Sequence, residues 1–264
     1  MDPSRISVAG GSVTEILYAL GAGDQIVGAD RTSNYPPEAL ELPQIGYVRN
    51  LSAEGVLSLS PTLVLGEDDM GPPDVVAQLE RVGLPVIAVP EAFTREGVIA
   101  KVRCVASVVG RVDAGEQLIR ERLLGEDVAA GSDASRGLVI LTLTEGAPIA
   151  AGRDTSGEGF LALAGATNAL SFNGWKPVSA EAMAAAAPEF IVITERGLQA
   201  AGGLDGLLDH PALRLTPAAA ERKVLAMDGM AMLGFGLRTL ETADRLRAFL
   251  DDEAADNQVL SKAH

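Results

Sequence analysis

The sequence predicts an α/β protein of two Rossmann-like lobes, each with a central parallel sheet, joined by a single long connecting helix, with a ligand cleft between the lobes. Three observations predict it: strand and helix patterns alternate, one phrase occurs once in each half, and a charged helical segment separates the halves. We expect an N-terminal lobe over 1–112, the connecting helix over 113–131 and a C-terminal lobe over 132–264.

Short apolar or β-branched runs alternate with amphipathic segments that end at Gly or Pro. In the first half we expect strands over 6–9, 26–29, 62–66 and 86–89, and helices over 12–21, 52–60, 73–83 and 94–109. The helical pattern over 113–130, at 1.5 Å per residue, would be about 25 Å long, enough to pass between lobes. In the second half we expect strands over 138–143, 190–194 and 224–227, helices over 156–165, 179–187 and 237–251, a glycine-rich turn before the last strand, and a frayed polar tail from residue 252.

The repeated phrase joins the two halves. Gly46–Glu54 reads Gly-Tyr-Val-Arg-Asn-Leu-Ser-Ala-Glu, and Gly174–Glu181 reads Gly-Trp-Lys-Pro-Val-Ser-Ala-Glu. Each copy continues through an apolar helical stretch to Pro61 or Pro188 and then into a strand pattern. A second pair of phrases precedes them in the same order: Ser12 and Ser156 each stand where a serine can cap an apolar helix. Related halves with one copy each suggest a ligand clamp.

Composition limits the classes of function. The formal net charge of −15 argues against a nucleic-acid or anionic-membrane partner, and 47% hydrophobic residues exclude general disorder. Cys104 is the only cysteine, so we expect no intrachain disulfide and no cysteine-built metal site. Its place in a helical pattern predicts a buried small apolar side chain rather than a reactive thiol. No secretory signal is recognisable in the opening residues, which fits either a cytosolic protein or a mature exported domain.

Tyr47 and Arg49 are the candidate chemical pair. Residues two apart in an extended segment project to one side, so a phenol and a guanidinium would face the same space. The guanidinium would stabilise a phenolate, which is a hard anionic ligand suited to ferric iron, including haem iron. The alternative is a tyrosine packed at a lobe edge beside a surface arginine.

Six phrases, in order along nearly the whole chain, resemble the haem-binding proteins of bacterial haem ABC importers, with a class III binding-protein fold. They are Gly10–Ile16, Thr32–Pro36, Ile45–Gly55, Gly71–Pro73, Lys176–Ala182 and Leu233–Arg238. This resemblance implies two lobes joined by one long helix, ferric haem held between them as transported ligand, iron acquisition as the role, and no catalysis. It also implies a periplasmic or otherwise extracytoplasmic location.

The resemblance also implies residue roles. Tyr47 would be the axial ligand to the haem iron, with Arg49 as its partner, and Arg238 would meet a haem propionate or the phenolate. Lys176 and Tyr35 belong to the same family phrases and are further candidates. Trp175, the only tryptophan, would pack either against the porphyrin or at the core edge of its own lobe.

One departure from the family concerns histidine. Some members carry a histidine just before the second-lobe phrase as ligand to a second, stacked haem, but here 171–175 reads Ser-Phe-Asn-Gly-Trp. We expect His210 and His264 at the surface, and one haem with Tyr47 as its strong protein ligand. The methionines around 227–232 are expected in the core.

Glu54 and Glu181 occupy matching positions in the two copies. They complement the helix dipoles, and the resemblance implies that each also docks on arginines of one subunit of a membrane-embedded ABC permease dimer, which works with its ATPase. An outer-membrane haem receptor is a further candidate partner, and we expect a monomer.

Two alternatives remain. A corrinoid or ferric-siderophore binder would share the architecture and the paired glutamates. A cytosolic nucleotide-binding enzyme could place a phosphate at the Gly10-Gly11-Ser12 turn, although this turn lacks the Walker lysine and the full dinucleotide-binding spacing. The sequence shows no Ser/His/Asp set and no paired-cysteine metal motif.

Overall fold

The structure is a computed structural model that describes residues 2–125, 134–144 and 146–251. The chain folds into two compact units. Unit 1 comprises Met1–Gly125 together with Gly234–Leu237, and unit 2 comprises Glu126–Leu233 and Arg238–His264. Of the predictions, the end of the connecting helix, the polar tail and His264 fall outside the described residues. Within the described part of the chain, no helix is both long enough and apolar enough to cross a membrane.

Unit 1 is built on a four-stranded parallel sheet in the order β2-β1-β5-β6. Its strands are β1 (Ile6–Ala9), β2 (Ile26–Ala29), β5 (Leu63–Glu67) and β6 (Val86–Val89). A separate two-stranded hairpin consists of β3 (Gly46–Tyr47) and β4 (Asn50–Leu51). The parallel sheet predicted for the first half is therefore confirmed, and the hairpin is an addition.

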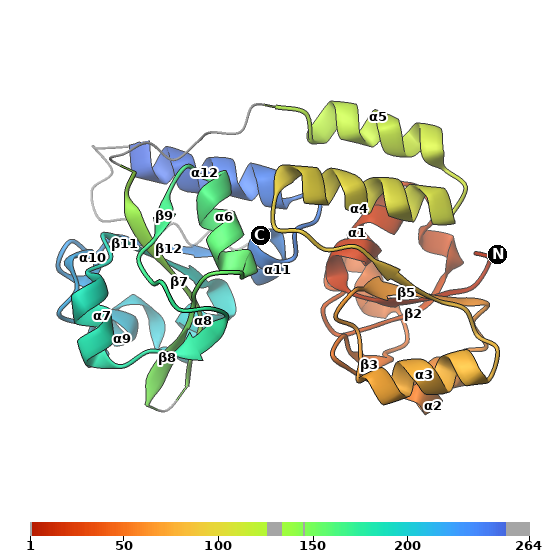
Figure 1. Ribbon diagram of the computed structural model, residues 1–264, viewed down its shortest axis with the longest axis horizontal. Coiled ribbons are helices and arrows are strands. Elements are labelled where there is room, and N and C mark those ends of the chain that lie inside the picture. Colours follow the sequence, from red (N-terminus) through yellow and green to blue (C-terminus); the bar gives the residue numbers. More distant parts are fainter. Residues whose placement is uncertain (1, 126–133, 145, 252–264) are drawn as a thin grey trace. The chain divides into compact units, whose positions relative to one another are not determined.

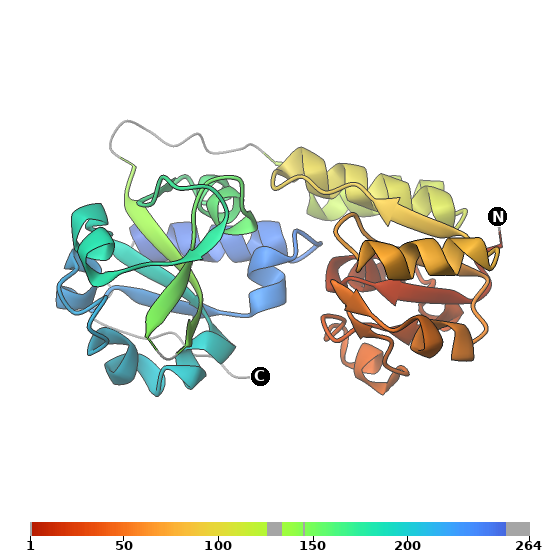
Figure 2. The same cartoon turned by 60° about the horizontal axis from the view of Figure 1, so that its bottom comes forward.

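Helices cover both faces of this sheet (Figure 1). They are α1 (Gly11–Ala19), α2 (Ala53–Ser58), α3 (Pro73–Arg81), α4 (Arg95–Val108) and α5 (Val112–Arg122). The 3₁₀ turns η1 (Gly23–Gln25) and η2 (Pro37–Glu41) complete the unit. Helices α2 and α3 enclose one apolar cluster with the hairpin, to which Val48, Leu51, Val56, Val64 and Leu79 contribute. Helices α1 and α4 lie on the opposite face, and α5 packs outside α4 (Figures 1 and 2).

The structure differs from the predicted domain boundaries in two places. Helix α5 ends at Arg122, and Leu123–Gly125 are not helical, so the helix predicted over 113–131 is shorter within the described residues. The short segment Gly234–Leu237, predicted in the second lobe, belongs to unit 1. The helix fails early because Leu124 and Gly125 follow the last charged turn, and glycine has low helix propensity.

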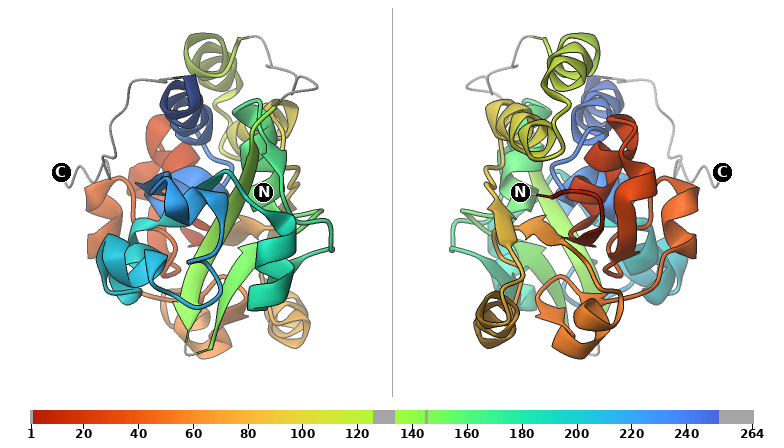
Figure 3. Two further views of the ribbon diagram at one scale, coloured as in Figure 1. Left: turned by 90° about the vertical axis from the view of Figure 1, so that its left-hand side faces the viewer. Right: turned by 90° about the vertical axis from the view of Figure 1, so that its right-hand side faces the viewer.

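Unit 2 has a mixed sheet in the order β10-β8-β7-β11-β12, with β9 pairing the start of β7. The strands are β7 (Arg136–Thr144), β8 (Ala147–Ala151), β9 (Thr167–Asn168), β10 (Trp175–Pro177), β11 (Phe190–Thr194) and β12 (Val224–Met227). Strands β7, β11 and β12 are parallel, whereas β8 runs antiparallel to β7 and β10. Figure 3 shows β7 and β8 side by side. The centre of the second sheet is therefore parallel, as predicted, and the antiparallel strands β8 and β10 are additions at one side of it.

Alternate residues of the central strands of unit 2 face two different cores. Leu138, Ile140 and Ile191 face α7 (Ala180–Ala186), α8 (Glu195–Ala200), α9 (Gly203–Leu208) and α10 (Pro217–Ala220). Val139 and Val192 face α6 (Ser156–Leu163), α11 (Gly229–Leu233) and α12 (Thr239–Asp251). The stretch predicted as a glycine-rich turn contains α8, α9 and α10, which are too short for a clear helical pattern.

Candidate functional site

Tyr47 and Arg49 lie on the β3–β4 hairpin, where Val48 and Arg49 form the tight turn between the paired residues Tyr47 and Asn50. The preceding segment extends the sheet beyond β2, because Ile45 donates its N–H to the Ala29 carbonyl at 3.1 Å. The hairpin therefore sits beside the carboxyl ends of the parallel strands, the edge where ligands bind in open α/β sheets.

Asp30, the first residue after β2, fixes the hairpin to the sheet. Its carboxylate is fully buried and accepts the backbone N–H groups of Gly10 and Val48, each at 2.9 Å. It also accepts hydrogen bonds from the hydroxyls of Thr32 and Ser33, at 2.8 and 3.2 Å. One carboxylate thus holds the turn after β1 and the residue between Tyr47 and Arg49.

The phenol and the guanidinium meet as the spacing predicts, although through a hairpin turn rather than an extended strand. Arg49 Nη1 donates to Tyr47 Oη at 2.7 Å, and Arg49 Nη2 forms an ion pair with Asp69. Burial disfavours the charge on Arg49, but Asp69 and Tyr47 outweigh it and hold the pKa of the guanidinium above its usual value. Asp69 therefore fixes the side chain that donates to Tyr47.

A second cation flanks the same ring. The guanidinium carbon of Arg31 lies 5.9 Å from the centroid of Tyr47, the same distance as that of Arg49. Tyr47 is half-buried, while Arg31 and Arg49 are exposed. Two cations therefore flank one phenol ring. Tyr35, the other tyrosine candidate, is 43% exposed and lies on the loop before η2.

The candidates of unit 2 are dispersed over different elements. Trp175 begins β10, is half-buried and packs against the core cluster under α6. Lys176 is exposed, with its Nζ 5.5 Å from the centroid of the Phe172 ring. Arg238 directly precedes α12 and pairs with Asp228 at 3.2 Å. Within unit 1, Tyr47 and Arg49 of the predicted ligand-binding set are in direct contact.

The two matched glutamates have the same local setting in both units. Ser52 Oγ accepts the N–H of Gly55 at 3.0 Å, and Ser179 Oγ accepts the N–H of Ala182 at 3.3 Å, so both serines cap short helices. Glu54 and Glu181 are exposed in the first turns of α2 and α7. Hydrogen bonds from its own N–H and from the Ser179 hydroxyl lower the pKa of Glu181.

Two backbone donors of the Gly10-Gly11-Ser12 turn, which could have held a phosphate, are already occupied. The N–H of Gly10 is bonded to Asp30, and that of Gly11 to Thr32 Oγ1 at 2.8 Å. The sequence predicted Ser12 as the cap of α1, but this serine lies inside the helix and donates to Glu67 Oε1 at 2.7 Å. Ser156 is likewise inside α6, and Thr155 provides the cap. The nucleotide-site hypothesis therefore loses two of the backbone donors on which it depends.

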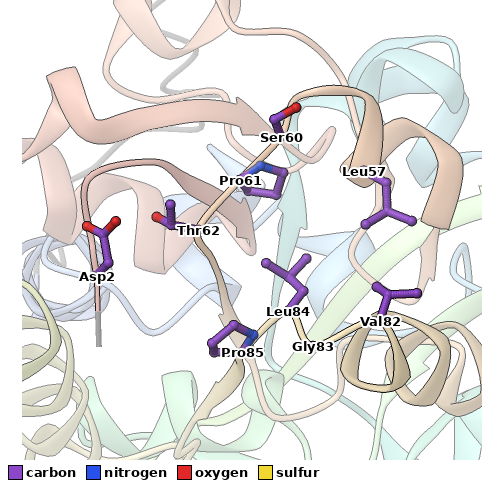
Figure 4. A pocket seen from close by; sticks show the side chains of 9 residues that line it. All are labelled: Asp2, Leu57, Ser60, Pro61, Thr62, Val82, Gly83, Leu84 and Pro85. Carbon is purple, nitrogen blue, oxygen red and sulfur yellow. The ribbon is translucent and has the colours of Figure 1, made fainter.

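A pocket of about 480 Å³ lies at the other end of the sheet in unit 1 (Figure 4). It is lined by the residues that precede β5 and β6, including Thr62 and Pro85, and by Leu57 and Val82. These positions are at the amino ends of the strands. The pocket is thus separated from Tyr47 by the length of the sheet.

Met227 and Met232 are buried in the core, as expected, whereas Met230 is only half-buried. Cys104 is a half-buried free thiol rather than a fully buried one, and burial raises its pKa. His210 is half-buried rather than at the surface, and it accepts the N–H of Ala212 at 3.2 Å in its turn. No group of three or more His, Cys, Asp or Glu side chains in the described segments could hold a metal ion.

Sequence reasoning missed Asp30, Arg31 and Asp69. A signal was present for two of them, because Asp30 follows β2 directly and Asp69 follows β5 closely, at the edge where polar side chains of parallel strands converge. Arg31 carried no such signal, since a charged residue in a loop is usually a solvated one.

The fold is that of a two-lobed solute-binding protein. The chain belongs to the periplasmic binding protein family, whose sequence signature matches residues 6–231. The uncharacterised ABC transporter substrate-binding lipoprotein YvrC of Bacillus subtilis is 27% identical over 203 residues, which are 74% of this chain but only 64% of that relative. A vitamin B12-binding protein of Pectobacterium carotovorum is 26% identical over 72% of this chain and 71% of its own.

Solved structures give a more specific likeness. The periplasmic haem-binding protein BhuT, in complex with two haems, is 38% identical with a TM-score of 0.86, over 93% of this chain and 97% of that one. The apo form of the periplasmic haem-binding protein RhuT from Roseiflexus sp. RS-1 is 34% identical with a TM-score of 0.84, over 93% and 97% of the two chains.

Proposed function

We propose that the protein binds ferric haem outside the cytoplasm and delivers it to an ABC-type import permease. The observation that carries this proposal is the 2.7 Å hydrogen bond from Arg49 to Tyr47 Oη beside the carboxyl edge of the unit 1 sheet. The similarity to haem-binding BhuT and RhuT supports it across 93% of the chain.

The chemistry of the pair suits ferric iron. A phenolate is a strong anionic oxygen ligand, and the guanidinium of Arg49 stabilises the negative charge left when the phenol loses its proton. Asp69 holds that guanidinium in place, and Arg31 adds a second positive charge near the ring. Arg238, Lys176 and Tyr35 remain candidates for contact with the propionates, because an arginine fork pairs well with a carboxylate. Trp175 remains a candidate for porphyrin contact.

Hemin titration of the purified protein, read by visible spectrum and stoichiometry, tests the proposal against its main alternative. We expect a saturable high-spin ferric spectrum, one haem per chain, and no saturable binding of cyanocobalamin in a parallel titration. One haem is expected because residues 171–175 contain no histidine to ligate a second. Saturable cobalamin binding, with no defined hemin spectrum, would instead support the corrinoid alternative suggested by the vitamin B12-binding relatives.

A second part of the proposal concerns the partner. Glu54 and Glu181 are exposed at capped helix starts, one in each unit, so each could engage one subunit of a twofold permease that works with its ATPase. Engagement at two points gains from effective concentration beyond either contact alone. A monomeric state and supply of haem by an outer-membrane receptor are further proposals.

Charge reversal tests this docking. Glu54→Lys and Glu181→Lys should lower haem transport in vesicles carrying the reconstituted importer, and the double variant should be worse than either single one. Hemin binding should be unchanged, and each reversal should cost only about 0.3–1 kcal/mol of stability through the helix dipole. Normal uptake by the double variant, at equal haem loading, would leave the two acids with a purely local role.

A further inference from the structure

Lys101, on α4, is buried without any exposed surface. Its Nζ donates to Glu91 Oε2 at 2.8 Å, to Ser12 Oγ at 2.9 Å and to the carbonyl of Gly234 at 3.2 Å. An ammonium group has three hydrogens, so these three acceptors satisfy it. The ion pair with Glu91 offsets part of the cost of removing the charge from water. The lysine is thus fully engaged inside unit 1.

The network continues from Ser12 to a second carboxylate. Ser12 Oγ donates to Glu67 Oε1 at 2.7 Å, so the hydroxyl relays the contact of Lys101 to the end of β5. Burial raises the pKa of Glu67, and the charge of Lys101 counteracts that shift. One ammonium therefore serves acceptors from α1, from the loop after β6 and from the Gly234–Leu237 segment, and it reaches the end of β5 through Ser12.

The Gly234–Leu237 segment is closely seated in unit 1. Phe235 is fully buried, and its ring centroid lies 5.2 Å from that of Phe93. Its backbone has φ of 46°, a left-handed conformation that a bulky residue keeps only where surrounding contacts hold it. A Cβ added to Gly236 would lie 3.3 Å from Ser12 Cβ, so the segment lies directly against α1.

The residue that follows the segment is Arg238. Its carbonyl accepts the N–H of Thr242 at 3.0 Å at the start of α12, and its guanidinium pairs with Asp228. Because Leu237 is bonded directly to Arg238, the position of the segment determines the position of the Arg238 backbone nitrogen. We propose that Lys101 is a positioning residue for haem binding, because its bond to the Gly234 carbonyl fixes the backbone from which Arg238 reaches the ligand. This inference rests on the proposed function.

The test compares Lys101→Met, which keeps the aliphatic stem but removes the donor, with Val102→Ala as a matched core variant. Val102 is also buried on α4 but faces Gly115 of α5. Amide hydrogen exchange is measured on the haem-free proteins, and the hemin dissociation rate on the loaded ones. We expect Lys101→Met to raise both the exchange of the 234–237 amides and the dissociation rate about tenfold, as loss of a charged hydrogen bond implies.

Non-additivity distinguishes positioning from simple destabilisation. If Lys101 acts through Arg238, adding Arg238→Ala to Lys101→Met should change the dissociation rate much less than Arg238→Ala changes it alone. The ferric spectrum given by Tyr47 should stay the same in all these variants. Equal dissociation rates in Lys101→Met and Val102→Ala, or effects of Lys101 and Arg238 that simply multiply, would overturn the proposal.

Gly236→Ala provides a second route if Lys101→Met does not fold. The added methyl group would press on Ser12 and displace the segment by a few tenths of an ångström, while every charge of the network stays in place. We expect faster hemin dissociation with an unchanged spectrum, and unchanged dissociation would count against the inference. Failure of the proposed function would look different, because the wild-type protein would then give no ferric spectrum with hemin. Amide hydrogen exchange would still report on the Gly234–Leu237 segment, because it is measured on the haem-free protein.

Discussion

The repeated phrase forms different structures in the two units. In unit 1, Gly46–Glu54 forms a separate hairpin that holds Tyr47 and Arg49 outside the main sheet, next to Asp69. In unit 2, the matching phrase forms β10, a strand of the main sheet, and its Trp175 packs into the core. The serine cap and the exposed glutamate that follows it are the same in both.

This difference shows that one part of the phrase is determined by local backbone geometry and the other part by tertiary contacts. The Ser-Ala-Glu part depends only on local backbone geometry, because a cap needs a hydroxyl and the N–H three residues later. The aromatic part depends on its surroundings, and in unit 1 these include a buried aspartate and two arginines near the ring. We infer that the shared part serves a partner that contacts both units, and that the divergent part serves the ligand.

The largest expected effect comes from removing the ligating oxygen alone. Tyr47→Phe should abolish the high-spin ferric spectrum and weaken hemin binding by about 100-fold or more, since even second-shell partners are worth 10–100-fold. The matched change in unit 2, Trp175→Phe, should keep the spectrum and lower the unfolding temperature, because it removes core atoms. An intact spectrum in Tyr47→Phe would transfer the assignment to Tyr35.

The second effect concerns the guanidinium. Acid breaks the iron bond by protonating the phenolate, and a nearby positive charge opposes that protonation. Arg49→Ala should therefore lose its ferric spectrum at a higher pH than Arg49→Lys, by about one pH unit. Spectra recorded during acid titration give both midpoints. The reverse order, or identical midpoints, would show that the hydrogen bond does not influence the ligand.

A third prediction contrasts Glu91, a largely buried carboxylate of unit 1, with Glu181, an exposed carboxylate of unit 2. Burial raises the pKa of Glu91 from 4.5 to about 7, against the opposing effect of Lys101 and with help from Glu67 and Asp68. The folded state thus binds this proton more tightly than the unfolded state, so stability falls as the pH rises from about 4.5 to about 7.

Glu91→Gln removes this dependence. Relative to wild type, the variant should gain stability between pH 5 and pH 8, by about 2 kcal/mol. Chemical denaturation at the two pH values measures the difference. The control is Glu181→Gln, because the pKa of Glu181 is lowered and its titration lies below this window. A relative stability of Glu91→Gln that is the same at both pH values would contradict the prediction.

The smallest effect should be equal in the two units. Ser52→Ala and Ser179→Ala each remove one cap hydrogen bond and should each cost roughly 1 kcal/mol, measured by thermal unfolding. Hemin binding should stay unchanged in both variants. If Ser52→Ala alone weakened binding, the cap and the hairpin of unit 1 would be coupled, and the two parts of the phrase would not be independent.

Much of the fold was predictable because most of its elements carry their own signals. The β-branched runs at 190–194 and 224–227 and the capped helix over α4 were found close to their true limits. The strand β8 and the helices α8 to α10 were missed, since segments of four to six residues show too little periodicity. The antiparallel position of β8 depends on its pairing with β7, which no local pattern specifies.

The site was predictable only in part. The spacing of Tyr47 and Arg49 predicted their contact. The contacts of Asp30 and Asp69 with the hairpin were not predictable, because these aspartates follow other strands, β2 and β5. Lys101 was invisible to sequence reasoning, because its acceptors Glu91 and Gly234 lie 10 and 133 residues away. Long-range partners of this kind carry no periodic or short-range signal.

Unit 1 is discontinuous in sequence, and this sets the order in which the protein can be completed. A chain emerging from the ribosome holds all of the unit 1 strands after residue 89. Even so, Phe93 lacks the ring of Phe235, and Lys101 lacks its third acceptor, the Gly234 carbonyl, until Gly234–Leu237 has been made. Domains usually finish folding one after the other during synthesis, the N-terminal one first. Here the first unit to begin must wait for nearly the end of translation, so an excised 1–125 fragment would expose an apolar ring and an uncompensated hydrogen-bond donor.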